Sequence, residues 1–475
     1  MTLKRKLLNG LAWSLGDKLV NQLGYLAVTI FIARHIGPES FGFIGMLTIF
    51  ILLADSVVNN GFTQALVQRS DSLTEDDAST IFYTNFAWGV GMYILMYISA
   101  PLIADFFREP ILVDISRVLF FVVIINSLAV VVRAKLTIDI NFRSQAVTGT
   151  FATLFSSILA IWLVFKGYGY WALVWLILSK SILQTIGLWF FCRWLPKLVF
   201  NMQSFNSLFK FGSNLMIAGI VATLVNNLYV AVIGRFYSAQ QVGYFTQANN
   251  LSSYLMKFIV SSLQGVTYPV MTSIKDDRTR LVNVYKKLIS ATMLVSLPIL
   301  VGLAAIADDF VLVFLGADWL PAVPVLIALC IARSITPISA INMNILNAIG
   351  RSDLFLRVDL FKLPITLLGL YLALPYGIVG VAWATVSISF VSFFINAYYP
   401  GKIFGFGAGK QIIVASKYFF SSVVMYCSVI LINFEGLILG LIAKLMLGVI
   451  VYFLMLFVLR DRFVKNVLSE LLGHK

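Results

Sequence analysis

The sequence contains few charged residues. Only 12% of its 475 residues are Asp, Glu, Lys or Arg, whereas about a quarter of a soluble domain is charged. Hydrophobic residues make up 60%, and the mean hydropathy is +0.92. This composition excludes an ordinary soluble domain and predicts an integral membrane protein.

Cysteine and histidine are also scarce. Cys192, Cys330 and Cys427 lie far apart, and no C-x-x-C spacing indicates a metal or redox site. His35 and His474 are isolated, whereas a catalytic or metal site needs convergent partners. We therefore expect neither an enzyme nor a cofactor or metal site.

The net charge of +14 does not indicate a nucleic-acid partner, because the charges fall in the short gaps between apolar runs rather than in one motif. These gaps are also too short to form a soluble catalytic domain.

The apolar runs predict about fourteen transmembrane helices, since about 20 mostly apolar residues cross a bilayer. The predicted segments are 10–33, 41–66, 81–104, 113–132, 145–165, 169–192, 208–234, 242–270, 288–307, 321–348, 354–374, 377–399, 411–432 and 436–459. The first apolar run continues past Asp17 and Lys18 without a convincing cleavage site, so we interpret it as a retained helix rather than a signal peptide.

The basic residues predict the orientation in the membrane. With the N-terminus in the cytoplasm, 25 of the 35 Lys and Arg residues lie on the cytoplasmic side and five on the opposite side. The remaining five lie within apolar segments. This bias follows the positive-inside rule and predicts that both termini are cytoplasmic.

Two helical hairpins repeat along the chain. Arg34, Gly42 and Phe43 match Arg235, Gly243 and Tyr244 at an offset of 201, and later matches drift to 208. Six helices separate the copies, so both enter the membrane from the same side, as in a parallel repeat. We predict an all-α fold with a six-helix bundle in 1–200, a second in 201–402 and two additional transmembrane helices in 403–475.

Polar side chains form stripes on the equivalent helices of the two bundles. The stretch Gln247–Gly265 carries polar residues at spacings of three and four, which lie on one helical face. Charge in the membrane is costly and usually faces a cavity or a partner. We predict that a central substrate cavity is lined by Lys18, Asn21, Tyr25, Asn226, Gln247, Asn250, Tyr254, Lys257 and Arg333.

Structural roles are the alternative for these intramembrane charges. Asp17, Lys18 and Asp55 are also compatible with ion pairs within a bundle. For Lys180 and Lys444 a structural role is favoured. Arg333 is equally compatible with a cavity and with a helix break near Pro337.

The excess of basic over acidic groups on these faces favours an anionic substrate, because Lys binds phosphate as a point charge. The many Asn, Gln, Ser and Tyr side chains suit sugar hydroxyls. A lipid pyrophosphate that carries an oligosaccharide has both features.

Several segments resemble the polysaccharide transporter family of the multidrug/oligosaccharidyl-lipid/polysaccharide exporter superfamily. They are IARHIGPESFGFIGM, ADSVVNNGFTQALVQR, YFTQANN and TYPVMTSIKDD, and the likeness is greatest to colanic acid and teichuronic acid exporters. The resemblance implies a flippase for undecaprenyl-pyrophosphate-linked oligosaccharide repeat units in the bacterial inner membrane, acting in exopolysaccharide, O-antigen or capsule biosynthesis. It implies membrane lipids, a polysaccharide polymerase and chain-length proteins as partners.

The resemblance also places cavity cations at Lys18 and Lys257, whereas the second helix carries Asp55 where a basic group is expected. Related members use a proton or sodium gradient, so Asp17 or Asp55 are candidates for ion coupling. The alternatives are a multidrug/cation antiporter, which favours acidic cavity residues, and a membrane-embedded glycan polymerase or glycosyltransferase, which generally needs a sizeable loop. A lipid scramblase or a structural partner of a synthesis complex also stays open.

Overall fold

Every regular element that the computed structural model describes is a helix. The description covers residues 3–59, 62–68, 73–274, 277–349, 351–432, 436–461 and 463–464, without the side chains of residues 3–20, 261–270 and a few others. The predicted all-α fold is confirmed.

Ten described stretches are long and apolar enough to cross a membrane. Eight correspond to one predicted segment each, and the other two, Asn21–Val58 and Asp353–Phe404, cover two predicted segments each. The predicted segments 208–234 and 242–270 coincide with the helices Met202–Phe236 and Ala239–Ser273, which are not among the ten. Some side chains of both helices lie outside the described residues. The chain is a multi-pass membrane protein, and the count of fourteen helices stays a prediction.

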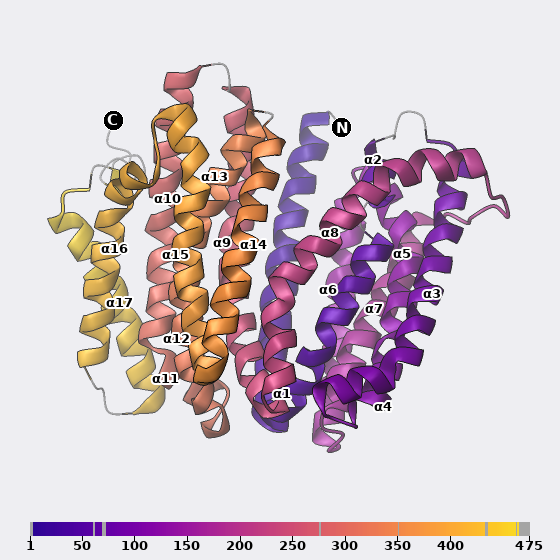
Figure 1. The fold of residues 1–475 in the computed structure, drawn as a ribbon, viewed down its shortest axis with the longest axis horizontal. Coiled ribbons are helices and arrows are strands. Elements are labelled where there is room, and N and C mark those ends of the chain that lie inside the picture. The colour runs from indigo at the N-terminus through magenta and orange to yellow at the C-terminus, as the bar shows by residue number, and fades with distance from the viewer. Residues whose placement is uncertain are drawn as a thin grey trace. The chain divides into compact units, whose positions relative to one another are not determined.

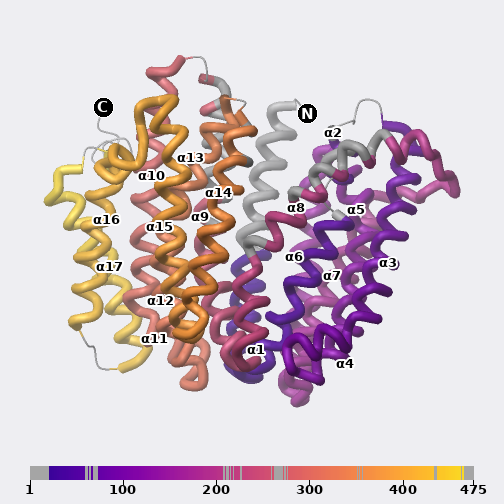
Figure 2. The backbone as a smooth tube through the Cα atoms, in the orientation of Figure 1, coloured from indigo at the N-terminus to yellow at the C-terminus, as the bar shows by residue number. Residues whose placement is uncertain are grey.

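The helices group into two compact units, Met1–Thr246 and Gln247–Lys475. The division at residues 200 and 402 came from the repeat rather than from compactness, and it stays a prediction. The backbone course of each unit can be followed in Figure 2.

The described part of the first unit contains eight helices and the start of a ninth. They are α1 (Leu3–Asn59), α2 (Phe62–Gln68), α3 (Glu75–Phe107), α4 (Leu112–Leu119), α5 (Phe121–Ile138), α6 (Phe142–Phe165), α7 (Trp171–Cys192), α8 (Met202–Phe236) and the start of α9 (Ala239–Ser273). Figure 1 shows α3, α5, α6 and α7 alongside one another, and α1 packs on α6 and α8.

The helix α1 consists of two helical segments that meet at Gly37. Gly37 has φ 74° and ψ 173°, a conformation that glycine adopts without steric cost, and Pro38 follows it. The two segments form the first predicted hairpin. Pro38 and the whole run from residue 41 to residue 47 are buried.

The helix α3 begins at Glu75, six residues before the predicted segment 81–104, with a capping box at Thr74. Thr74 accepts a hydrogen bond from the Asp77 backbone N–H and Asp77 returns one to the Thr74 N–H, which completes a capping box. In the same turn Glu75 pairs with Lys135 of α5 at 2.6 Å and accepts a bond from the Trp194 indole at 2.5 Å. These contacts hold the connector that precedes α8 against α3.

Among the residues that the structure describes, the second unit contains the rest of α9 and eight further α-helices. They are α10 (Arg278–Ala305), α11 (Ala307–Phe314), α12 (Val323–Ser334), α13 (Thr336–Ala348), α14 (Ser352–Ala373), α15 (Gly377–Phe404), α16 (Ala408–Leu431) and α17 (Leu437–Val458). Two short 3-10 helices, η2 (Ala317–Ala322) and η3 (Leu374–Tyr376), connect them. The helix α10 packs on α12 and α16, and α15 packs on α12 and α14.

A buried ring of three polar side chains joins α10, α13 and α16. The Tyr285 hydroxyl donates to the Asn342 side-chain oxygen, and the Asn342 amide donates to Gln411 at 3.0 Å. The Gln411 amide then donates back to the Tyr285 oxygen at 3.0 Å. All three residues are fully buried. Because a buried polar group is costly unless it is bonded, the ring fixes how these helices meet.

The helices α16 and α17 attach to the second unit through further polar contacts. Lys444 of α17 pairs with Asp309 of α11 at 2.5 Å, and the Tyr452 hydroxyl donates to the Leu294 carbonyl at 3.1 Å. The ion pair agrees with the structural role that the sequence favours for Lys444.

Candidate functional site

The predicted cavity residues fall into two groups, one in each unit. The side chains of Asp17, Lys18 and Asn226 lie outside the described residues, so their predicted roles stay predictions. The first group contains Asn21, Tyr25 and Asp55, and the second contains Gln247, Asn250, Tyr254, Lys257 and Arg333.

Arg333 lies in the last turn of α12, immediately before the helix breaks at Ile335. Pro337 follows in the first turn of α13, so the break and a polar site coincide at Arg333. The guanidinium donates one hydrogen bond to the Asn249 side-chain oxygen at 2.7 Å and another to the Ser252 hydroxyl. Both acceptors are neutral and belong to α9.

Lys257 lies two turns after Asn249 on α9 and acts on Arg333 as a like charge. Its side chain is exposed. In the part of the chain that the structure describes, neither Arg333 nor Lys257 has a carboxylate within the 4.0 Å of an ion pair. Charged side chains in membrane segments usually pair with a partner or mark a substrate path, so the two cations are candidates for an anion site.

Gln247 is the most deeply buried residue of the α9 stripe. It is 1% exposed, and neither its side-chain nitrogen nor its side-chain oxygen has a hydrogen-bond partner among the described residues. Asn250 and Tyr254 are half-buried. The stripe thus contains one buried amide, that of Gln247, without a described hydrogen-bond partner. Unpaired buried amides are uncommon in proteins and call for an explanation, such as a functional role or an ordered water.

In the first unit, Asn21 and Tyr25 contact polar residues of two other helices. The Asn21 side-chain oxygen accepts a hydrogen bond of 2.5 Å from the Thr153 hydroxyl of α6. The Lys180 ammonium of α7 lies 4.4 Å from the centre of the Tyr25 ring, a cation–π geometry. Lys180, for which the sequence favours a structural role, therefore belongs with two of the predicted cavity residues.

Asp55 is engaged within its own unit. The Asn126 amide of α5 donates to its carboxylate at 3.1 and 3.4 Å, and the Ser181 hydroxyl of α7 donates to the Asn126 oxygen at 2.6 Å. Arg133 acts on Asp55 as an opposite charge. The next residue, Ser56, is bonded to Thr223 of α8 at 2.8 Å. These contacts support the structural alternative for Asp55.

Sequence reasoning did not single out Asn249, Ser252, Asn126 and Arg133. Asn249 and Ser252 lie beside the α9 stripe rather than on it, so the spacing of three and four residues passes over them. The adjacent pair Asn249 and Asn250 in an apolar helix was the available signal, because both faces of that turn then carry an amide.

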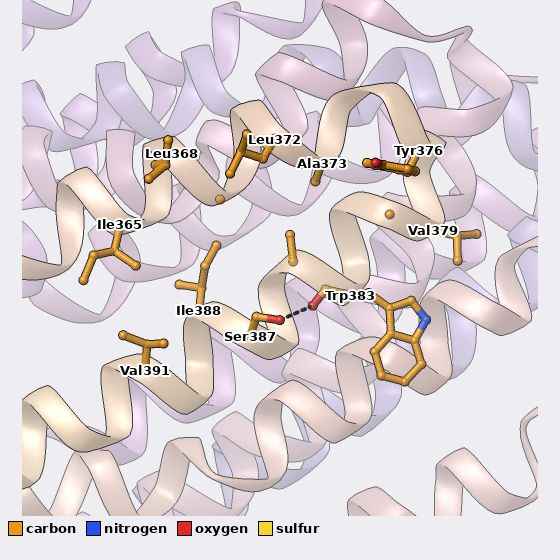
Figure 3. A pocket seen from close by; sticks show the side chains of 13 residues that line it. Ile365, Leu368, Leu372, Ala373, Tyr376, Val379, Trp383, Ser387, Ile388 and Val391 are labelled. Carbon is orange, nitrogen blue, oxygen red and sulfur yellow. Dashed lines mark hydrogen bonds between the residues drawn. The ribbon is translucent and has the colours of Figure 1, made fainter.

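A groove between α14 and α15 has a different character. It has a volume of about 680 Å³ and is lined by residues such as Leu368, Leu372, Tyr376, Trp383 and Val391 (Figure 3). The Ser387 hydroxyl donates to the Trp383 carbonyl at 3.4 Å. The lining therefore offers contacts for hydrocarbon and not for a charged head group.

Comparison with known proteins identifies a family from the sequence and solved structures of the same fold from the coordinates. The family profile described as "Polysaccharide biosynthesis protein" matches residues 31–324. The teichuronic acid biosynthesis protein TuaB of Bacillus subtilis (strain 168) is 29% identical, over 73% of this chain and 72% of that protein. The lipopolysaccharide biosynthesis protein WzxC of Escherichia coli (strain K12) is 25% identical, over 76% and 74%. The structure of the lipid II flippase MurJ shares the fold, with a TM-score of 0.79, 16% identity and coverage of 96% of this chain and 99% of that one.

Proposed function

The chain belongs to the polysaccharide biosynthesis protein family, and we propose that it is a flippase for lipid-linked oligosaccharides. The substrate is an oligosaccharide repeat unit on undecaprenyl pyrophosphate, which the protein moves across the bacterial inner membrane. The names of TuaB and WzxC support this, because both refer to the biosynthesis of surface polysaccharides. The protein is a transporter rather than an enzyme.

One observation carries the proposal: two neutral side chains of α9, the helix that also carries Lys257, hold the Arg333 guanidinium, and neither cation has a carboxylate partner among the described residues. A pyrophosphate supplies the missing negative charge. The fork of Arg333 binds phosphate oxygens with two parallel N–H groups, and the Lys257 ammonium adds a point charge. Asn249 and Ser252 hold the guanidinium in one orientation through neutral acceptors, which leaves its positive charge for the substrate.

The neutral polar side chains suit the sugars. The half-buried Asn250 and Tyr254 bring an amide and a phenol on one face of α9, and the buried Gln247 amide lies one turn before Asn250. In the first unit Asn21 and Tyr25 contribute an amide and an aromatic face. Sugar hydroxyls both donate and accept, so amide groups satisfy them in either orientation.

Transport lowers the cost of moving a charged head group through hydrocarbon. A charge at the centre of the bilayer costs about 2.5–3.5 kcal/mol even on the mildest scales. Within the protein the pyrophosphate instead meets the two cations, while the undecaprenyl chain stays in lipid. Alternating exposure of the site to the two sides then moves the head group.

The remaining expectations belong to this proposal. The positive-inside bias supports cytoplasmic termini, and a proton or sodium gradient supplies the energy, with Asp17 or Asp55 as coupling residue. The contacts of Asp55 with Asn126 and Arg133 favour Asp17 for that role. A polysaccharide polymerase and chain-length proteins are the expected partners downstream.

A multidrug/cation antiporter is less well supported, because it needs acidic groups that are free to bind a cation. The described acid of the polar group in the first unit, Asp55, is already bonded to Asn126. The pair in the second unit is cationic.

Proteoliposomes test the proposal. The purified protein is reconstituted with undecaprenyl-pyrophosphate-linked oligosaccharide isolated from the cells that express it, and a membrane-impermeant sugar-binding lectin reports the glycan on each face. Flippase activity predicts that the protected glycan becomes accessible, and the Arg333→Ala protein should be inactive. Equal rates with and without the protein would overturn the proposal.

A further inference from the structure

Two pairs of residues at the repeat offset of 201 contact each other reciprocally. Gly42 and Gly243 are equivalent positions in the two hairpins, and so are Pro38 and Ala239. In the structure Gly42 packs on Ala239, and Gly243 packs on Pro38. We call these four residues the glycine crossing, and all of them lie in the first unit.

The backbones at the glycine crossing leave no space for a side chain. A Cβ atom added to Gly42 would lie 1.8 Å from the carbonyl oxygen of Ala239, and one added to Gly243 would lie 1.8 Å from the carbonyl oxygen of Pro38. Cβ atoms essentially never approach other atoms below 3.0 Å, so the backbones would have to separate by more than an ångström. Glycine in a helix costs roughly 0.5–1 kcal/mol relative to alanine, and this contact offsets that cost.

The residues around the crossing differ in exposure. Arg34, His35 and Glu39 are exposed, whereas the run from residue 242 to residue 245 is buried. A Cβ on Gly45, one turn further in, would meet the Thr246 hydroxyl at 2.5 Å. The close fit therefore continues inward for about one helical turn.

We propose that the glycine crossing is a releasable closure of one end of the transport path. The contacts of Gly42 and Gly243 are made to backbone carbonyls and involve no hydrogen bond between side chains, so the hairpins separate there without stranding a polar side chain. The buried ring of Tyr285, Asn342 and Gln411 is the opposite kind of contact, because separating it would strand buried polar groups. The equivalent hairpins of the two repeats meet here, where a rocking of one repeat against the other must break contacts.

This inference rests on the proposed transport function, and thiol labelling separates the two. Cys192, Cys330 and Cys427 are replaced by serine, and Val242→Cys, a fully buried position in the closed crossing, is introduced. Intact cells are treated with a membrane-impermeant maleimide. If the crossing is a closure, the cysteine at position 242 should be labelled slowly in the protein with native glycines. It should be labelled faster when Gly42→Ala or Gly243→Ala holds the two hairpins apart.

Gly91→Ala is the matched control, since a Cβ on this helical glycine would meet no atom within 4 Å. It should leave labelling and surface polysaccharide unchanged. If the crossing variants do not accumulate, the native glycines still give a test: Val242→Cys should be labelled faster than Leu119→Cys, although both positions are fully buried.

Equal protection of residues 242 and 119, or unchanged labelling in folded Gly42→Ala, would overturn the closure. The two hypotheses can also be told apart. If the glycine variants speed the labelling of residue 242, but loss of the protein leaves the surface polysaccharide of the cells unchanged, the closure is supported and the proposed function is contradicted.

Discussion

The guanidinium of Arg333 donates a hydrogen bond of 2.7 Å to the side-chain oxygen of Asn249, 84 positions earlier in the chain. A second bond reaches the Ser252 hydroxyl on the same helix. Both acceptors are neutral, so the guanidinium is oriented but keeps its full charge. A structural arginine in a membrane protein is normally paired with a carboxylate, and this difference leads to the first two predictions.

The first prediction concerns the geometry of Arg333. Arg333→Lys keeps the charge but loses the planar fork, and we expect it to lower the rate of flipping by roughly tenfold to a hundredfold, the equivalent of one charge-assisted hydrogen bond of about 1.5–3 kcal/mol. Flipping in proteoliposomes measures this. Arg351→Lys is the control, because Arg351 is an exposed residue paired with Asp353 at 2.9 Å, and it should flip at the native rate. Equal rates for Arg333→Lys and the native protein would remove Arg333 from the site.

The second prediction concerns Lys257. Lys257 and Arg333 carry like charges that repel each other when no anion is bound, so Lys257→Met should raise the melting temperature in detergent. The same variant should lower the rate of flipping by about tenfold or more, because a cation that binds the phosphate is lost. A higher melting temperature together with slower flipping is expected for a cation that binds substrate and not for one that stabilises the fold. Lys257→Arg should retain most of the activity because it keeps the charge. A melting temperature that falls with activity would indicate a structural role instead.

The matched substitution is Lys444→Met. Lys444 is paired with Asp309 at 2.5 Å, and both side chains are largely buried. Removing one partner of a fully buried pair costs about 3–5 kcal/mol, and we expect about 1–3 kcal/mol here because Asp309 is partly exposed. The melting temperature should fall, while flipping per folded molecule stays native. Loss of flipping at unchanged stability would place Lys444 in the transport path.

Hydropathy and spacing predicted the all-helical fold and the face of α9 that carries Gln247, Asn250, Tyr254 and Lys257. They could not predict which charges are neutralised, because the partners are distant in the sequence. Asp55 is bonded to Asn126, which is 71 positions away. Lys180 faces Tyr25, which comes five predicted helices earlier. The rotation of each helix about its axis decides such pairs, and only the packing of the whole unit fixes that rotation.

The glycine crossing shows the same limit. The repeat identifies Gly42 and Gly243 as equivalent residues, but a repeat does not say that equivalent residues meet. That requires the two hairpins to approach until backbone contacts backbone, which is a property of the folded unit.

The third prediction concerns the buried ring in the second unit. Gln411→Leu removes the acceptor of the buried Asn342 amide and a donor to the Tyr285 oxygen, so the Asn342 amide is left without a partner while Tyr285 keeps its bond to Asn342. Each stranded group costs about 1–3 kcal/mol, so the melting temperature should fall clearly. Replacing all three residues by apolar ones of similar shape should recover part of the loss, because no polar group is then stranded. A Gln411→Leu protein with native stability would mean that the ring does not hold these helices together.

The fourth prediction concerns Glu109, in the connection between α3 and α4. Partial burial, and the like charge of Glu39, raise the pKa of Glu109 above its ordinary value of 4.5, whereas the hydrogen bond from the backbone N–H of Ala239 opposes that rise. A raised folded-state pKa means that folding favours the protonated carboxyl. Its contribution to stability is full below pH 4.5 and is lost as the pH rises through the folded-state pKa.

Glu109→Gln keeps an oxygen that accepts the Ala239 N–H bond but carries no charge, so it should be more stable than the native protein at pH 7. The advantage should shrink as the pH approaches 4.5, which melting temperatures of both proteins between pH 4 and pH 8 would measure. Asp114→Asn serves as the control at pH 7, since it also removes a negative charge, from the first turn of α4. If Glu109→Gln is less stable than the native protein at pH 7, the charge on the bond to Ala239 outweighs burial and the repulsion from Glu39, and Glu109 then stabilises the start of α9 as a carboxylate.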